Sequence, residues 1–449
     1  MDLKDTICAL STPPGTGAIS LVRISGVKTM EILYAVFESK THKQVFEPYR
    51  IYLGFIRDGI ELIDEVLISF FQKPHSFTGE DMVEISCHGS TYIQKSILEL
   101  LIRKGCRLAE PGEFSMRSFL NGKMDLSQAE AISDLIASQS KAAHQLALHH
   151  LRGGFSNKIK DLREQLLHFA ALLELELDFA EEDVEFANRS EVSNLLIALK
   201  TELSRLIDSF TMGNVFKNGI PVAIVGKPNV GKSTLLNTLL NEDRAIVSEI
   251  PGTTRDTIED CINIHGFIFR FIDTAGIRNT LDEVEMLGIE RTYKAIEQAM
   301  FILYLIDKEE EAIDEMIELS EKYKEKKILF LVNKSDLLKH IPISSGRDIL
   351  YISAKKKINI SLITNELQEY ASELYTTGET LVSNTRHYEA LLRARESLLQ
   401  AEHAFEKQLS TEFIMVDIRQ VLYYLGTIVG EITNDEILRS IFSRFCIGK

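Results

Sequence analysis

The chain has 449 residues, of which 45% are hydrophobic and 26% charged, and its formal net charge is -16. This length is too great for one compact core, so two or three domains are expected. The composition is that of an ordinary soluble protein, and no apolar stretch approaches the ~20 residues that a membrane-spanning helix needs. The negative charge opposes broad, non-specific nucleic-acid binding. An RNA substrate would therefore need local basic patches and a partner that contributes much of the binding.

The N-terminus and the cysteines both indicate the cytoplasm. The opening residues, MDLKDT, lack the basic and apolar regions of a signal peptide and include acids that a transit peptide would avoid. The cysteines are scattered without CxxC spacing, at Cys8, Cys87, Cys106, Cys261 and Cys446. This distribution argues against a disulfide framework or a zinc site and fits a reducing compartment.

Residues 1–120 have the pattern of a mixed α/β domain. Apolar, β-rich runs alternate with a segment of helical period at 91–104. The candidate strands are 7–10, 18–24, 66–71 and 82–85. Turn signals at Pro13-Pro14-Gly15 and Pro111-Gly112 separate these elements.

A helical pattern begins near Ser127. The segment Ser127–Glu130 reads as a capping box, with Leu126 placed to pack onto Ala131. The predicted helices run to about 151, from 157 to 177, and then to about 210, and His149 and His150 are expected on a helix surface. The acidic run 178–185 between the second and third helices is interpreted as a solvated turn without a metal.

Five motifs in the middle third of the chain follow the order found in guanine-nucleotide-binding proteins. They are Gly226–Ser233 (GKPNVGKS), Gly252–Asp256 (GTTRD), Asp273–Gly276 (DTAG), Asn333–Asp336 (NKSD) and Ser353–Lys355 (SAK). The first is a P-loop between an apolar strand at 222–225 and a helix at 234–240, which is the context this motif requires. Together the five motifs predict a GTPase.

Each motif contributes a specific chemistry. Backbone N–H groups around Gly231 can bind phosphates at a helix N-terminus, Lys232 adds a positive charge, and Ser233 offers a hydroxyl to Mg²⁺. Asp273 ends an apolar strand, where its carboxylate can bind the magnesium through water. The Asp336 carboxylate can accept hydrogen bonds from N1–H and the exocyclic amine of guanine, groups that adenine lacks in that arrangement.

The nucleotide-binding module spans 216–374, and its strands alternate with helices. The candidate strands are 222–225, 269–272, 301–306, 328–332 and 350–352. This alternation predicts a mostly parallel sheet with helices on both faces and the nucleotide at the carboxyl ends of the strands. Helical patterns return at 386–403 and 415–425, so the flanks are expected to form one helical domain into which the module is inserted.

The sequence departs from Ras-like enzymes at the residue that orients the attacking water. That position, directly after the DTAG motif, holds the apolar Ile277 instead of glutamine. Arg255 and Arg278 are candidates for an arginine finger, but both are better interpreted as members of ion pairs near the nucleotide. Hydrolysis therefore needs another carboxylate or amide and another positive charge, and Glu285 is the candidate for the carboxylate. Asn229 could help to bind a monovalent cation in that place.

Linear blocks along almost the whole chain resemble the bacterial and organellar tRNA-modification GTPases of the MnmE/TrmE family. They are far more specific than the P-loop. The blocks are Asp5–Ile7, Thr12–Gly15, Arg23–Gly26, Phe77–Asp81, His88–Gly89, Pro111–Phe114, Phe119–Leu126, Gln128–Ala131, Asp178–Asp183 and Cys446–Lys449.

The resemblance implies three parts and a set of partners. An α/β folate-binding and dimerisation domain spans 1–120, an all-α helical domain 121–215 and 375–449, and an inserted Ras-like G domain 216–374. Members form homodimers and work with an MnmG/GidA-type flavoprotein, with which a heterotetramer is expected and through which FAD and NADH enter. They install an aminomethyl or carboxymethylaminomethyl group on the 5-carbon of the wobble uridine of certain tRNAs. GTP hydrolysis drives G-domain dimerisation and domain rearrangement.

The resemblance also implies roles for individual residues. Glu285 matches the catalytic glutamate, Ser233 and Thr254 the Mg²⁺ ligands, and Cys446 a possible functional thiol. The K⁺ ligands would be Asn229, Ser248, Ile250 and Thr253, and the residues binding 5-formyl-tetrahydrofolate would be Arg23, Glu84, Lys123 and Lys449. The GTP-binding residues would be Asn229, Val230, Gly231, Lys232, Ser233, Thr234, Ser248, Glu249, Ile250, Pro251, Gly252, Thr253, Thr254, Asp273, Thr274, Ala275, Gly276, Asn333, Lys334, Asp336, Ser353, Ala354 and Lys355.

Two alternatives stay open at this point. Cys446 is either a buried, inert residue or a functional thiol near the folate or the uridine. Prenylation is disfavoured because Gly448 is not aliphatic and Lys449 is not a usual last residue.

A regulatory or ribosome-assembly GTPase is the other function class, but no KH domain with its Gly-x-x-Gly loop is visible after residue 374. The folate-type first domain favours tRNA modification.

Overall fold

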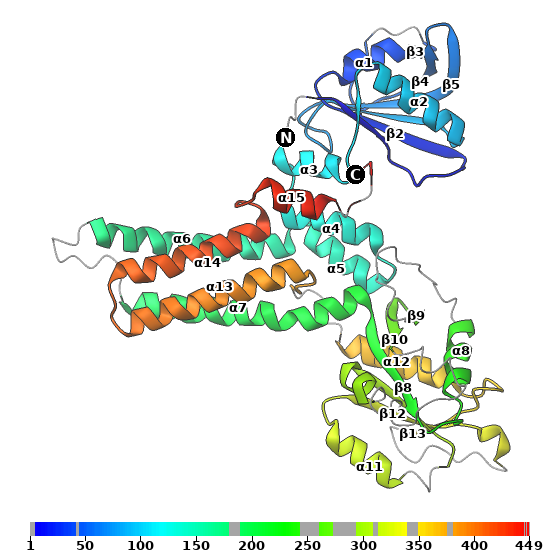
Figure 1. Cartoon of the computed structure of the whole chain (residues 1–449), viewed down its shortest axis with the longest axis vertical. Coiled ribbons are helices and arrows are strands. Elements are labelled where there is room, and N and C mark those ends of the chain that lie inside the picture. The colour runs from blue at the N-terminus through cyan, green and yellow to red at the C-terminus, as the bar shows by residue number, and fades with distance from the viewer. Residues whose placement is uncertain are drawn as a thin grey trace. The chain divides into compact units, whose positions relative to one another are not determined.

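The computed structural model describes residues 5–41, 45–178, 189–242, 260–272, 293–308, 313–338, 349–374, 380–443, 445 and 447–448. The chain divides into two compact units. The first comprises Met1–Ile136, His150–Leu196 and Arg393–Lys449, and the second comprises Ala137–His149 and Ile197–Leu392. The α/β and all-α parts expected from the sequence are both present (Figure 1).

The first unit contains a seven-stranded sheet in the order β3-β4-β5-β6-β2-β1-β7. Its strands are β1 (Ile7–Leu10), β2 (Ile19–Ser25), β3 (Phe37–Ser39), β4 (Ile51–Asp58), β5 (Glu61–Phe71), β6 (Met82–His88) and β7 (Arg107–Leu108). All neighbouring strands pair antiparallel except β1 and β7, which are parallel.

Two helices cover one face of this sheet. α1 (Thr29–Val36) and α2 (Thr91–Arg103) bury residues such as Leu33 and Leu100 against alternate strand residues such as Val22 and Ile85. Because side chains alternate along a strand, the intervening residues of β2 and β6 point to the opposite face. The positions of candidate folate-binding residues on these strands therefore follow from the hydrophobic pattern.

A buried ion-pair network joins the chain start to α3 (Glu113–Leu120). Arg117 is completely buried, and its Nη2 lies 2.5 Å from Asp5 Oδ1 and 3.0 Å from Glu113 Oε1. Burial alone would raise the pKa of Glu113, but hydrogen bonds from Arg107 and Arg117 hold that pKa below its ordinary value. Both carboxylates thus remain charged beside the arginines, which balances the charge of the buried guanidinium.

The helices that follow α3 in the first unit pack against one another. Besides α1, α2 and α3, this unit contains α4 (Leu126–Ala137), α6 (Gly154–Asp178), α14 (Thr411–Val429) and α15 (Asp435–Phe442), together with parts of α5 (Lys141–Leu151), α7 (Arg189–Asn218) and α13 (Thr385–Glu406). α6 and α14 lie side by side (Figure 1) and are joined by an ion pair between Glu174 and Arg419. Phe442 of α15 packs against Leu126 and Met116, which places the C-terminal residues beside the first domain.

Three local predictions for the helical part were wrong. The capping box lies two residues earlier than predicted: Asp125 Oδ1 accepts from the Gln128 N–H, and Gln128 Oε1 accepts from the Asp125 N–H. The pattern predicted one helix up to 151, but α4 ends at Ala137 and α5 begins at Lys141. His150 is buried (4% exposed) against Phe155, so it is not a helix-surface residue.

The second unit contains a six-stranded sheet in the order β13-β12-β11-β8-β10-β9. Its strands are β8 (Ile220–Gly226), β9 (Asp260–Ile264), β10 (Phe267–Phe271), β11 (Phe301–Ile306), β12 (Lys327–Val332) and β13 (Ile349–Tyr351). All pairs are parallel except β9 with β10. The mostly parallel sheet predicted from the alternation is confirmed, although the antiparallel edge strand β9 was not predicted.

Helices cover both faces of this sheet. α8 (Lys232–Glu242) and α12 (Ile360–Leu374) contribute Leu235 and Leu367 to the core on one face. On the other face, Ile296 packs with strand residues such as Val225, and Met316 of α11 (Ile313–Lys322) packs against this cluster. None of the described helices combines the length and apolar character that a membrane span requires.

Candidate nucleotide-binding site

The P-loop follows β8, which lies between its parallel neighbours β10 and β11. The loop turns sharply at Gly226 (φ +143°) and Gly231 (φ +105°) before α8 begins at Lys232. A Cβ on Gly226 would lie 2.3 Å from the Leu305 carbonyl oxygen, so only glycine fits there. The first N–H groups of α8 therefore lie at the carboxyl edge of the sheet, where a helix N-terminus binds anions.

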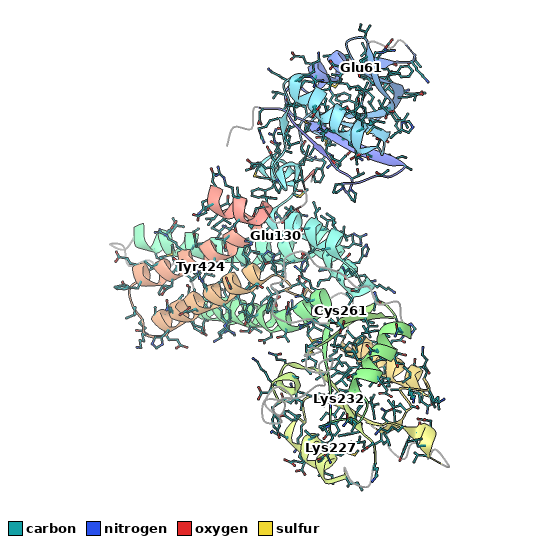
Figure 2. All side chains as sticks on the ribbon, turned by 45° about the vertical axis from the view of Figure 1, so that its right-hand side comes forward. Glu61, Glu130, Lys227, Lys232, Cys261 and Tyr424 are labelled. Carbon is teal, nitrogen blue, oxygen red and sulfur yellow. The ribbon has the colours of Figure 1, made fainter. Side chains whose placement is uncertain are left out.

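Lys232 and Lys227 of the P-loop lie in the same part of the structure (Figure 2). Its Nζ donates to the carbonyl oxygens of Gly226, at 2.7 Å, and Lys227, at 2.8 Å. Burial lowers the pKa of Lys232 from its ordinary value because it disfavours the charged ammonium, and a phosphate bound beside it would stabilise the charged form again. Ser233 is the next residue in the first turn of α8, so the ammonium and the hydroxyl start from adjacent positions, as phosphate and Mg²⁺ binding require.

Asn333 connects the P-loop with the two motifs that are predicted to read the base. It follows β12 and is 5% exposed. Its Nδ2 donates to the Val230 carbonyl oxygen at 2.7 Å, and its Oδ1 accepts from the Ala354 N–H at 3.0 Å. A single amide thus fixes the phosphate loop relative to the SAK motif.

The carboxylate of Asp336 is held at the same edge. Asp336 lies in a 3₁₀ turn (Ser335–Leu337) that starts after Lys334 in a left-handed conformation. Its Oδ1 accepts a hydrogen bond from Ser353 Oγ at 2.5 Å, and the Ser335 N–H donates to the Ile352 carbonyl oxygen at 3.0 Å. The NKSD and SAK motifs therefore form one base-reading edge, defined here as residues 333–336 and 353–355.

A second cluster of candidate residues lies on the face of the first sheet opposite α1 and α2. Arg23 of β2 is directly opposite Glu84 of β6 in the strand register, and Arg23 Nη2 lies 2.7 Å from Glu84 Oε1. The rings of Phe77 and Phe114 lie 5.4 and 5.5 Å from Arg23 Cζ. Sequence reasoning did not give these rings a role, although both lie in blocks that were recognised.

The C-terminal segment reaches this Arg23–Glu84 pair. The Gly448 carbonyl oxygen accepts from Arg23 Nη1 at 3.2 Å and from Ser11 Oγ at 3.1 Å. A Cβ on Gly448 would lie 2.3 Å from the Leu10 carbonyl oxygen, so this approach requires glycine. Lys123 is exposed, with its Cγ 3.4 Å from the position of a Cβ on Gly79. The structure therefore brings together Arg23, Glu84 and the residue before Lys449.

Two family models together match almost the whole chain. A "GTP-binding protein TrmE N-terminus" matches residues 6–123, and an "MnmE helical domain" matches residues 126–446. A "tRNA modification GTPase MnmE" from Flavobacterium psychrophilum is 52% identical over 462 residues, covering 100% of each chain. The chain belongs to the MnmE/TrmE family.

Other MnmE proteins are similar over the same extent. The protein of that name from Cytophaga hutchinsonii is 50% identical over 451 residues, covering 99% of this chain and 98% of the relative. That from Bacteroides fragilis is 49% identical over 469 residues, covering 99% and 100%. The solved G domain of the T. maritima FeoB iron transporter covers 34% of this chain and 98% of its own, at 23% identity and a TM-score of 0.26. That score is too low to support an argument.

Membership of the MnmE/TrmE family makes this chain a GTP hydrolase. The described P-loop and base-reading edge bring residues predicted to bind phosphate, to bind magnesium and to read guanine to one edge of the sheet. Several predicted residues lie outside the described residues and stay predictions. They are Ser248, Glu249, Ile250, Pro251, Gly252, Thr253, Thr254, Arg255, Asp273, Thr274, Ala275, Gly276, Ile277, Arg278, Glu285, Cys446 and Lys449.

Replacing Asp336 should change which base the MnmE-type site accepts. We expect Asp336→Asn to weaken GTP binding and to favour xanthosine triphosphate, because the new amide donates to the exocyclic oxygen of xanthine. Bidentate recognition of this kind typically discriminates by ~1–3 kcal/mol. A competition assay with the two nucleotides measures the change, and an unchanged preference for GTP would remove Asp336 from base reading.

Proposed function

We propose that this chain is a potassium-dependent GTPase that, with an MnmG-type flavoprotein, modifies the 5-carbon of the wobble uridine of certain tRNAs. Its family membership gives the coarser function, a GTP hydrolase that acts in tRNA modification. The observation that supports the proposal most is the combination, in one chain, of an intact base-reading edge and a TrmE-type first domain. A GTPase that only switches has no need of that domain.

The P-loop residues fit GTP and Mg²⁺. The N–H groups at the start of α8 and the Lys232 ammonium bind the phosphates, and the hydroxyls of Ser233 and Thr254 would bind Mg²⁺. Bound Mg²⁺ would neutralise the negative charge that develops on the phosphates during hydrolysis. Asp336 selects guanine, and Glu285 would orient the attacking water in place of the absent glutamine at Ile277.

Potassium would occupy the place that an arginine finger has in other GTPases. Asn229 has a left-handed backbone (φ 60°) and is exposed at the P-loop, so its side chain is available to a cation near the phosphates. Oxygen atoms of Ser248, Ile250 and Thr253 would complete the set. Neutral oxygen ligands of this kind suit a weakly hydrated monovalent cation, which supplies positive charge without a partner protein.

The first domain fits a reduced folate. The carboxylate of Glu84 can accept from the N–H groups of a pteridine, and the Arg23 guanidinium holds that carboxylate in place. Lys123 and Lys449 would pair with the glutamyl carboxylates of 5-formyl-tetrahydrofolate. The contact of Gly448 with Arg23 supports this assignment because Lys449 is the next residue. Cys446 is either inert or a thiol near the same ligand.

The organisation we propose follows the family. The folate-binding domain (1–120) would dimerise, the helical domain (121–215 and 375–449) would link it to the inserted G domain (216–374), and the G domains of a homodimer would meet on GTP binding. A heterotetramer with the flavoprotein would bring FAD and NADH to the tRNA in the cytoplasm.

Mass spectrometry of wobble nucleosides tests this function. Cells that lack the chain should accumulate tRNA with an unmodified 5-carbon at the wobble uridine, because in this proposal the chain supplies the GTP hydrolysis on which the modification depends. Complementation with the wild-type chain should restore the modified nucleoside. An unchanged nucleoside profile in the deletion strain would exclude the proposed tRNA function while leaving the GTPase activity intact.

A further inference from the structure

The β9–β10 hairpin connects the two segments that are predicted to contact the nucleotide. Its strands form an antiparallel ladder from Phe267 opposite Ile264 to Phe271 opposite Asp260. The chain enters β9 soon after the predicted ion-binding residues 248–254, and it leaves β10 immediately before Asp273. The ladder is about 17 Å long at the usual rise per strand residue. Both segments that are predicted to contact the nucleotide are therefore attached to this one hairpin.

The tip of this hairpin is a tight turn. His265 and Gly266 both have positive φ values, 51° and 93°, which is the conformation of a two-residue hairpin turn. Asn263 stabilises the turn because its Oδ1 accepts from the Gly266 N–H at 3.0 Å. The tip is thus fixed relative to the strands behind it.

The tip binds the start of α5 (Figure 1). The Ala142 N–H donates to the Gly266 carbonyl oxygen at 3.2 Å, and Asn263 Nδ2 donates to the Gln139 carbonyl oxygen at 2.9 Å. The first N–H groups of a helix have no partner within the helix. Here Ser140 Oγ accepts from the Ala143 N–H, and the Gly266 carbonyl oxygen of the hairpin accepts from the Ala142 N–H. The hairpin tip is therefore part of the N-terminal cap of α5.

An apolar contact supports the polar one. Phe267, the first residue of β10, packs with Ala142 and Leu146 of α5 and with Phe216 of α7. The rings of Phe216 and Phe267 are 6.5 Å apart. All of these residues belong to the second unit, and the chain passes into the first unit within α5, between His149 and His150. The hairpin therefore contacts the start of a helix whose other end belongs to the unit that contains the first domain.

We propose that the β9–β10 hairpin transmits the nucleotide state of the GTPase site to α5, with Asn263 and Gly266 as the coupling residues. β9 is an edge strand, and β10 joins the sheet through three register pairs with β8, so the hairpin lies at the margin of the sheet with a neighbouring strand on one side alone. A shift at its nucleotide end moves the tip and lengthens the bonds to Ala142 and Gln139. This inference rests on the proposed function, in which GTP hydrolysis drives rearrangement of the domains.

The variant Asn263→Asp separates the coupling from the turn itself. Its carboxylate still accepts from the Gly266 N–H, but it cannot donate to the Gln139 carbonyl oxygen and repels it. His265→Asn is the matched control, because His265 is exposed at the same tip and asparagine tolerates a left-handed backbone. Gly266→Ala is the second test variant, since its Cβ would lie 2.9 Å from Lys141 Cβ.

Amide hydrogen exchange of the full-length chain is the first measurement. In the wild type, exchange at Ala142 and Ala143 should differ about tenfold between the states with GDP and with a non-hydrolysable GTP analogue, the size of one net hydrogen bond. Asn263→Asp should remove this nucleotide dependence, and His265→Asn should keep it. Equal wild-type exchange in both states would overturn the proposal, whatever the variants do.

Two activities form the second measurement. Asn263→Asp should retain single-turnover GTP hydrolysis within about twofold, and it should lower tRNA modification with the flavoprotein by about 5- to 150-fold, the usual range of coupling between sites. If hydrolysis and modification fell together, the hairpin would act in hydrolysis and the coupling role would be wrong. Absence of modification by the wild type itself would instead contradict the proposed function, and the exchange measurement would still decide the coupling.

Discussion

Replacing potassium by sodium at matched ionic strength should slow GTP hydrolysis by this chain ~10³-fold or more, the effect of an arginine finger in other GTPases. No arginine-finger signature is present in the sequence, and Asn229 is exposed at the P-loop beside Val230 and Gly231. A fixed positive charge near the phosphates stabilises the charge of the transition state. Single-turnover rates at a series of potassium concentrations measure this dependence.

Two substitutions at Asn229 separate ion binding from loop strain. Asn229→Gly removes the side-chain oxygen but keeps the left-handed backbone without strain, so the rate in potassium should fall to that in sodium. Asn229→Asp keeps an oxygen and tolerates the same backbone, so it should retain part of the stimulation. Equal wild-type rates in the two salts would show that potassium has no part in hydrolysis.

Glu285→Ala should lower the turnover of GTP steeply, by ~10²–10⁴-fold, the usual contribution of a general base or water-orienting group. Ile277 cannot orient water, and Glu285 lies twelve residues after Asp273 in the segment predicted to contact the nucleotide. The carboxylate would act through an ordered water once the two G domains of a dimer meet. GTP affinity should stay nearly unchanged, because Glu285 has no assigned contact with the base, ribose or phosphates.

Glu283→Ala is the matched control for this substitution. It removes the same charge from the same segment and should change neither turnover nor affinity by much. Single-turnover hydrolysis in potassium, together with a direct titration of GTP binding, separates the possibilities. Either a parent-like rate in Glu285→Ala or an outright loss of GTP binding in that variant would end the assignment.

The nucleotide site was the part most predictable from the sequence. Its groups act through short linear motifs whose chemistry demands particular residues, and the structure brings Lys232, Asn333 and Asp336 to one edge of the sheet as expected. The bond from Asn333 to the P-loop was not predicted, because it joins residues more than 100 positions apart and depends on the parallel order of β8, β11 and β12.

Several elements of the first domain were not predicted, for identifiable physical reasons. β4 has apolar residues on both faces, since Ile51 and Leu53 are exposed while Tyr52 and Ile56 are buried, so its alternation is hidden. Short elements such as α1, α3 and α15 have too few turns for a clear helical period. The resemblance placed Arg23 and Lys449 at one site, but the hydrogen bond from Arg23 to the Gly448 carbonyl oxygen depends on the fold and was not predicted.

Mass spectrometry of wobble uridines, made in a strain whose only copy of this chain is supplied on a plasmid, tests the tRNA function most directly. The wild-type chain should give the nucleoside modified at the 5-carbon, and Lys232→Ala, which removes the charge on the phosphates, should give the unmodified form. A full complement of modified nucleoside in cells expressing Lys232→Ala, or in cells without the chain, would contradict a GTP-driven role in this modification.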